Sequence, residues 1–337
     1  MLPYKLILRR FLWVLPVAFG VVTITFFMAR IFNGDPTELY APPEATEALR
    51  QQIRAQLGLA DSLPLQFIRY LWRLLHFDFG VSFSTGENVS RELWERLPAT
   101  LELGLLGLTL GIVAGMPLGV LAAVNRERWP DFLVRGITLS GMALPQFWIG
   151  LVLIWIFFVT LHWFPGPIGR LPIGTEPPPR LTGFMLIDTL AAGNPGLWWD
   201  ALRQLGLPVL TLGFAALAPI ARVTRASMVE AMQSDYIRTA VAMGHRKRVI
   251  WFRYSLRNAS LPVVTLIGGM AGHIFAGAVL LESIFGWPGL GQYALQSIER
   301  SDFAALQGFV IYASLLYVVA FLIVDVLYLL IDPRVRS

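Results

Sequence analysis

Residues 99–124 read ATLELGLLGLTLGIVAGMPLGVLAAV, with Glu102 as their only charged side chain. An α-helix rises about 1.5 Å per residue, so about 20 apolar residues cross a hydrocarbon core of roughly 30 Å. This stretch is longer than that, and basic residues flank it at Arg96 and Arg126. It predicts a membrane-spanning helix, and it decides that the chain is an all-α integral membrane protein.

Five further apolar runs of similar length occupy the rest of the chain. The composition agrees, because 55% of the 337 residues are hydrophobic and the mean hydropathy is +0.61, more than one soluble core can use. The first run is too long for a cleavable signal peptide, whose apolar core has roughly 7–15 residues. Pro208 and Pro219 predict a kink in the fourth. The six predicted spans are 11–31, 99–124, 136–161, 203–222, 260–284 and 305–331.

Positive charge is concentrated at about residues 222–258, between the fourth and fifth predicted spans. Lys and Arg in short loops favour the cytoplasmic side, so this loop is predicted to be cytoplasmic. The alternation of six spans then places both termini in the cytoplasm. The formal net charge of +5 arises from such residues at the ends of spans, and nucleic-acid binding is not expected. The basic residues of the loop are Arg222, Arg225, Arg238, Arg246, Lys247, Arg248, Arg253 and Arg257.

Residues 33–98 then lie outside the cytoplasm, and they carry two helical patterns. Apolar residues recur at helical spacing over Ala45–Leu57 and stop before Gly58, a residue type that commonly ends helices. A second pattern covers Leu65–Leu75. We expect a small helical insert on the membrane surface. The predicted domains are 1–98, with the first span and the insert, and 99–337, with a five-helix core and the cytoplasmic loop.

Several kinds of chemistry are excluded by residues that the chain lacks. Without cysteine there are no disulfides, thiolate metal sites or cysteine nucleophiles. The phosphate-binding loop G-x-x-x-x-G-K-[ST] places lysine after glycine, but Lys5 follows Tyr4 and Lys247 follows Arg246. No His, Asp and Glu cluster has metal-ligand spacing. We therefore expect no ATPase site, no cofactor and no enzyme activity in this chain.

Three ionisable residues in the predicted spans are candidates for a translocation pathway or gate: His273, Glu282 and Asp325. Such residues are costly in a membrane and often serve a function. Glu282, like Glu102, lies near the external end of its span, where an interfacial role is an equal alternative. For Asp325 a structural pair with a neighbouring helix is the favoured alternative. An ion-coupled carrier would use Glu282 or Asp325, and an intramembrane enzyme would be centred on His273.

The most informative segment is DYIRTAVAMG, residues 235–244 of the cytoplasmic loop. A short helix with an apolar stripe needs a partner surface, and one anchored between two spanning helices can transmit movement of a soluble subunit into the membrane. The alternative is a helix that lies on lipid. The residues that can share the stripe are Tyr236, Ile237, Ala240, Val241 and Gly244.

This segment resembles the EAA loop of ABC-importer permeases, in the form used by the dipeptide and oligopeptide branch of the DppB type. Gly244 and Ala240 match the glycine and the second alanine of that loop. Arg238 and Thr239 stand where the general motif has glutamate and the first alanine, so no glutamate-mediated contact is carried over. Other matching segments follow in order: Gly34–Pro36, Leu57–Leu59, Arg96–Leu103, Gly115–Ala123, Leu144–Trp148, Leu181–Thr189, Trp287–Gly291 and Asp332–Arg334.

The resemblance implies a type I ABC-importer permease with six transmembrane helices in the bacterial inner membrane. It implies a second homologous permease subunit, two ATPase subunits that bind ATP and Mg²⁺, and a periplasmic substrate-binding protein that the external insert helps to dock. The implied substrate is a dipeptide or short peptide, with nickel, a haem precursor or an opine as alternatives. The residues implied to couple to the ATPase are Asp235, Tyr236, Ile237, Arg238, Thr239, Ala240, Ala242 and Gly244.

Overall fold

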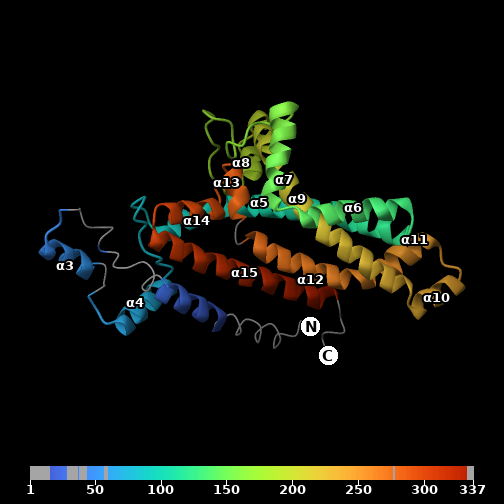
Figure 1. The fold of residues 1–337 in the computed structure, drawn as a ribbon, viewed down its shortest axis with the longest axis horizontal. Coiled ribbons are helices and arrows are strands. Elements are labelled where there is room, and N and C mark those ends of the chain that lie inside the picture. The colour runs from blue at the N-terminus through green and yellow to red at the C-terminus, as the bar shows by residue number, and fades with distance from the viewer. Residues whose placement is uncertain (1–15, 29–36, 38–43, 57–59, 276–277, 332–337) are drawn as a thin grey trace.

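A computed structural model shows the chain as an arrangement of helices (Figure 1). It describes residues 16–28, 37, 44–56, 60–275 and 278–331, with the side chains of the last helix described as far as Ile323. Those residues contain no β-strand, only an isolated bridge between Val81 and Asn88. The all-helical fold predicted from the sequence is confirmed.

The helices fall into three groups: those before residue 76, those in the loop between α9 (Pro195–Met232) and α12 (Leu256–Phe275), and all the others. An apolar helix, Pro16–Met28, comes first, and two insert helices follow it, α3 (Glu47–Gln56) and α4 (Leu63–Leu75). The loop between α9 and α12 contains α10 (Asp235–Ala242), α11 (Lys247–Val249) and the π-helical turn η2 (Ile250–Ser255). The remaining helices are α5 (Val89–Val124), α6 (Trp129–Ala143), α7 (Gln146–Leu153) with its π-helical continuation η1 (Ile154–Thr160), α8 (Met185–Ala191), α9 (Pro195–Met232), α12 (Leu256–Phe275), α13 (Val279–Ile284), α14 (Leu290–Glu299) and α15 (Phe303–Ile331).

Among the described residues, three single helices are long and apolar enough to cross a membrane: α5, α9 and α15. A fourth candidate is the pair formed by α6 with α7 and η1. The helix α9 is continuous through Pro208 and Pro219. The chain is thus an α-helical membrane protein.

The third predicted span, 136–161, differs from a single straight helix. Its two halves are bent by 107° at the break between α6 and α7. Leu144 has an extended backbone with ψ 134°, the conformation that a following proline favours, and Pro145 cannot donate the amide hydrogen that a continuous helix needs. In Figure 1, α6 runs beside α5, whereas α7 turns away from the direction of α5 and α6.

The fifth predicted span, 260–284, is also divided. Its helix α12 ends at Phe275, and a separate short helix, α13, starts at Val279. Ala278 between them has a non-helical backbone, with φ −87° and ψ 71°. The prediction of one helix to residue 284 is therefore wrong, because the end of the segment is held by contacts outside α12.

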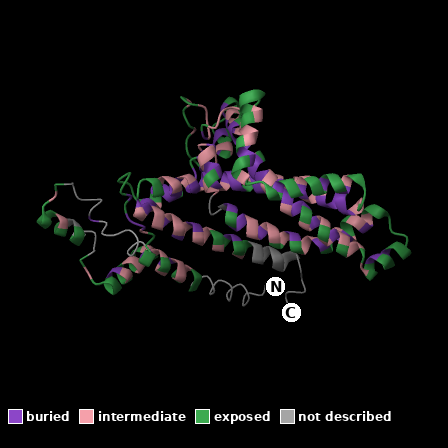
Figure 2. Cartoon of the chain, viewed as in Figure 1, coloured by how far each residue is buried: buried purple, intermediate pink, exposed green. Residues whose placement is uncertain are grey.

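A seam of glycines joins α5 to α9, and the two helices pack along most of their length. A Cβ added to Gly107 would lie 2.6 Å from Leu212, and one added to Gly111 would lie 2.5 Å from the Cβ of Ala216. Glycine at every fourth position forms one face of a helix and allows a close approach of backbones. Figure 2 shows buried residues along this interface. The glycines of the seam are Gly107, Gly111, Gly115 and Gly119.

The predicted insert helices are confirmed as α3 and α4, while the predicted end at Gly58 lies outside the described residues. The insert is tied to the start of α15 by Asp302, which is fully buried. Its Oδ2 accepts hydrogen bonds from Ser82 Oγ at 2.6 Å and from the Ser84 amide at 2.9 Å. Burial alone would raise the pKa of Asp302, but these bonds and one from the Ala305 amide hold the pKa below its usual value. A carboxylate that stays charged therefore joins the insert to the core.

We predict that Gly111→Ala destabilises the protein although alanine is the better helix former. The added methyl group would clash with Ala216, and overpacking of this kind costs about 1–3 kcal/mol. Thermal unfolding in detergent measures the effect. The matched control is Gly136→Ala on α6, where nothing lies within 4 Å of the added Cβ. Equal melting temperatures for the two variants would contradict close packing at the seam.

Candidate functional site

The helix α10 is held to η2 by its inner face. Ile237 is 5% exposed and Ala240 is 1% exposed, and both pack in a small cluster with Ile250, Trp251 and Tyr254 of η2. Because η2 continues directly into α12, a displacement of α10 together with η2 would also displace the start of α12.

The apolar stripe predicted for α10 is divided between two environments. Its centre, Ile237 and Ala240, is buried, whereas its edges, Tyr236 and Val241, are 40% and 58% exposed. Met243 adds a further apolar side chain, 65% exposed, just after the helix. An apolar surface therefore remains open beside the face that is packed on η2 (Figure 2).

Gly244 ends α10 in a left-handed conformation, with φ +76°. The Gly244 amide donates to the carbonyl of Val241 at 2.9 Å, and the His245 amide donates to the carbonyl of Ala240 at 3.2 Å. This pair of bonds is the Schellman motif, which satisfies the last carbonyls of a helix. Nothing lies within 4 Å of a Cβ added at Gly244, so its backbone conformation, not lack of space, favours glycine here.

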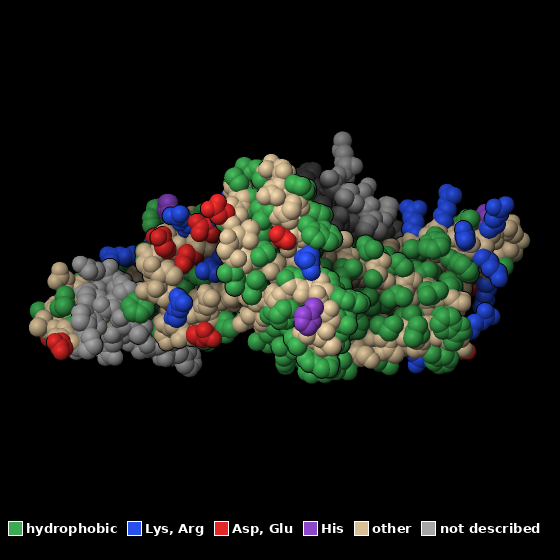
Figure 3. All heavy atoms as spheres, turned by 90° about the horizontal axis from the view of Figure 1, so that it is seen from above, with side chains coloured by type: hydrophobic (Ala, Val, Ile, Leu, Met, Phe, Trp, Pro, Cys, Tyr) green, Lys and Arg blue, Asp and Glu red, His purple; other side chains and the backbone are tan. Residues whose placement is uncertain are grey.

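The loop also gathers positive charge. Figure 3 shows Lys and Arg side chains clustered at the end of the molecule that carries α10 and α11, next to a surface dominated by hydrophobic side chains. The predicted coupling residues Asp235, Arg238, Thr239 and Ala242 are all exposed on or beside this surface. The arrangement is suited to docking a soluble protein on the helix.

A groove of about 410 Å³ lies between α7, α9 and α12, and His273 lines it. Gln146, at the start of α7, also lines it, and its Nε2 is buried without a hydrogen-bond partner among the described residues. Thr265 and Gly269 border it from α12, and a Cβ added at Gly269 meets nothing within 4 Å. An apolar groove with isolated hydrogen-bonding groups can accommodate a small polar molecule that passes through the membrane.

Glu282 does not line this groove and is instead 1% exposed in a buried joint. Its Oε1 accepts a bond from Thr100 Oγ1 at 2.8 Å, and its Oε2 accepts one from the Gly291 amide at 2.7 Å. Gly291 belongs to the first turn of α14, where the helix dipole stabilises a negative charge. A Cβ at Gly289 would lie 2.5 Å from this carboxylate, and one at Gly291 would lie 2.7 Å from the backbone of Val279, so both positions of the WPGLG segment are too close-packed for a larger residue. The geometry gives Glu282 a structural role.

Glu102 also forms a structural contact. It accepts a 2.6 Å bond from Arg170 and a 2.8 Å bond from the amide of Leu186, at the start of α8. Asp325 falls in the part of α15 whose side chains lie outside the described residues. Within the residues that the structure describes, no group of three acidic or histidine side chains could hold a metal ion.

Two polar features of the core were missed by the sequence reasoning. Asp131 is fully buried at the start of α6 and pairs with Arg225 of α9, with Nη2 and Oδ2 2.7 Å apart. Gln146 was read only as part of the segment Leu144–Trp148. Asp131 could have been noticed as a lone acidic residue directly before an apolar run, but its partner is 94 positions away.

Comparison with known proteins identifies the class. A family described as "Binding-protein-dependent transport system inner membrane component" matches residues 115–337, and its N-terminal counterpart matches residues 1–104. The chain belongs to this family of inner-membrane permease subunits of ABC importers. These are multi-pass membrane proteins, not enzymes, and ATP hydrolysis belongs to a separate subunit.

Individual relatives are similar over almost the whole chain. A probable D,D-dipeptide transport system permease protein of Escherichia coli K12 is 45% identical over 98% of this chain and 97% of its own length. The dipeptide transport system permease protein of the same strain is 39% identical over 98% of both chains. A di/tripeptide transport system permease protein of Pseudomonas aeruginosa is also 39% identical over 98% of both. The resemblance inferred from the sequence is confirmed.

We predict that Gly244→Val loosens the end of α10 while Gly244→Asn preserves it. A β-branched residue is strained at positive φ, whereas asparagine adopts this conformation readily. Hydrogen–deuterium exchange of residues 235–245 in the purified chain is the measurement. Faster exchange is expected for the valine variant alone, and equal exchange in both variants would show that the Schellman motif does not stabilise α10.

Proposed function

We propose that this chain is one of two homologous permease subunits of a type I importer that moves dipeptides or short peptides into the cytoplasm. The relatives named for dipeptide and di/tripeptide transport support this substrate class. A nickel, haem-precursor or opine permease is the alternative within the family. Two ATPase subunits and a periplasmic binding protein complete the proposed assembly.

The membrane arrangement is part of the proposal. Six spans are assigned to the first apolar helix, α5, the bent pair of α6 and α7, α9, α12 and α15. The basic loop around α10 faces the cytoplasm, which supports a cytoplasmic location for both termini. Residues 1–98 form the unit with the external insert, and the insert contributes to docking of the binding protein.

One observation carries the mechanism: the helices that flank the coupling loop, α9 and α12, are also the helices that line the His273 groove. Docked ATPase subunits hold the exposed edge of α10, at Tyr236 and Val241. When ATP closes them, α10 moves with η2 through the buried contacts of Ile237 and Ala240. The movement of α12 against α9 then opens or closes the groove, so His273 and Gln146 lie on the proposed translocation pathway.

An ion-coupled carrier is the rival class, and the groove offers little support for it. The described residues that line it include no carboxylate, Glu282 is occupied by the joint with α14, and the side chain of Asp325 lies outside the described part of the chain. Proteoliposomes distinguish the two classes. We expect the chain alone to transport no dipeptide under a proton or sodium gradient, and the full assembly to transport with ATP. Gradient-driven uptake by the chain alone would overturn the proposal.

The pathway assignment predicts that Gly269→Trp blocks peptide uptake by the full assembly. An indole at this open position would fill the groove beside His273. Uptake of labelled dipeptide into proteoliposomes is measured together with co-purification of the ATPase, which should be unchanged. Gly136→Trp, at an equally open position on α6, is the matched control and should transport normally. Normal uptake by Gly269→Trp would place the pathway elsewhere.

A further inference from the structure

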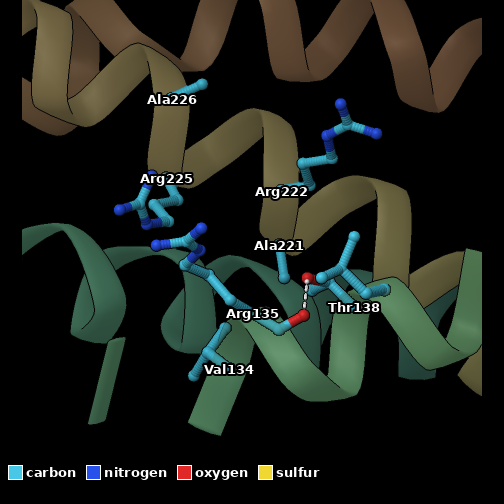
Figure 4. Close-up of a pocket in the computed structure, with 8 residues that line it drawn as sticks. Val134, Arg135, Thr138, Ala221, Arg222, Arg225 and Ala226 are labelled. Atoms are coloured by element: carbon cyan, nitrogen blue, oxygen red, sulfur yellow. Dashed lines mark hydrogen bonds between the residues drawn. The ribbon is translucent and has the colours of Figure 1, made fainter. Parts of the chain in front are cut away.

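A second cavity, of about 250 Å³, lies between α6 and α9 and is lined by three arginines (Figure 4). Arg135 comes from α6, and Arg222 and Arg225 come from successive turns of α9. In Figure 4 the guanidinium groups of Arg135 and Arg225 point toward one another, while Arg222 extends in a different direction. These three arginines lie neither on α10 nor in the lining of the His273 groove.

The positive charge of this pocket is only partly balanced. Asp131 engages Arg225 through both of its oxygens and also accepts a bond from the Glu127 amide at 3.0 Å. Within the described residues, neither Arg135 nor Arg222 has a carboxylate at ion-pair distance. The hydrogen-bond acceptor of Arg222 is the sulfur of Met142 at 3.6 Å, which is a weak acceptor. Two guanidinium groups at the pocket therefore have no carboxylate partner among the described residues, and that of Arg135 lies 5.9 Å from the centre of the Phe132 ring.

The surroundings of the pocket are apolar and exposed. On α6, Trp129 is 75% exposed, Phe132 is 58% exposed and Leu139, which lines the pocket, is 61% exposed. Tryptophan is enriched at the level of lipid headgroups. Arg135 follows Trp129 by six residues, a rise of about 9 Å along the helix, and a long arginine side chain can reach back to the interface. Arginines and apolar side chains thus meet where headgroups meet acyl chains.

We propose that this pocket binds the phosphate of an anionic phospholipid of the cytoplasmic leaflet. The planar fork of N–H donors in arginine matches phosphate oxygens, and that leaflet carries the anionic lipids. The acyl chains of the lipid would cover the exposed apolar face of α6, which a free phosphate ion would leave uncovered. The choice of leaflet rests on the proposed orientation, with the loop around α10 in the cytoplasm, but the lipid site at α6 and α9 does not depend on which substrate is transported.

Native mass spectrometry of the full-length chain, after removal of endogenous lipid, tests the site. Phosphatidylglycerol, phosphatidylcholine and inorganic phosphate are added separately. We expect phosphatidylglycerol to bind more tightly than phosphatidylcholine, and millimolar inorganic phosphate not to displace it. Arg135→Gln/Arg222→Gln should weaken phosphatidylglycerol binding roughly 30-fold, as expected for two basic residues at an anionic headgroup.

Two further variants make the result decisive. Arg135→Lys/Arg222→Lys keeps the charge but not the planar fork, so it should restore part of the binding, which excludes misfolding as the cause of the loss. Arg246→Gln/Arg248→Gln removes the same charge from exposed positions outside the pocket and should leave binding unchanged. Equal phosphatidylglycerol binding by the pocket double variant and the unsubstituted chain, or displacement of the lipid by inorganic phosphate, would each overturn the proposal.

Discussion

The close approach of α5 and α9 is the constraint on which the rest of the structure depends. Glycine at every fourth position of α5 brings the two backbones so near that even a methyl group would collide with Ala216 or Leu212. In lipid, where apolar side chains gain little by leaving the solvent, such close packing is a principal source of helix association. The remaining helices are arranged around this pair: α6, α7, α8 and α12 each pack on α9, and α14 and α15 pack on α5.

The loop that carries α10 begins at the end of α9, and α9 is packed closely against α5. The helix α9 is held along α5, whereas α12 is reached only through η2 and the small cluster around Ile237 and Ala240. In the proposed mechanism a force on α10 acts on α12 through η2, and α12 itself packs on α9 and α15. The proposed function requires this displacement to change the width of the groove between α9 and α12.

The sequence predicts some parts of this arrangement well. Hydrophobic run length indicates the membrane class, and helical periodicity indicates α3, α4 and α10, because both signals depend on neighbouring residues. The bend at Leu144 and Pro145 was readable from the proline alone, yet the length of the apolar run outweighed it. The seam over Gly107, Gly111, Gly115 and Gly119 was also readable from its spacing and was overlooked.

Long-range contacts could not be predicted in this way. The bond between Glu282 and Thr100 joins positions 182 apart, and no local pattern specifies it. For this reason the sequence leaves Glu282 open between a pathway role and an interfacial one, whereas the structure places its carboxylate in hydrogen bonds to Thr100 and the start of α14. The division of the α10 stripe into a buried centre and exposed edges likewise depends on η2, whose position the helix's own sequence does not encode.

The bond between Ser82 and Asp302 has a consequence for how the chain is made. Its two partners are 220 positions apart. A ribosome adding about 5–20 residues per second needs roughly 10–45 s to synthesise that interval. During this time the segment around Ser82 has been synthesised but lacks the carboxylate that accepts its hydrogen bond, so this contact forms only after the start of the last helix has been translated.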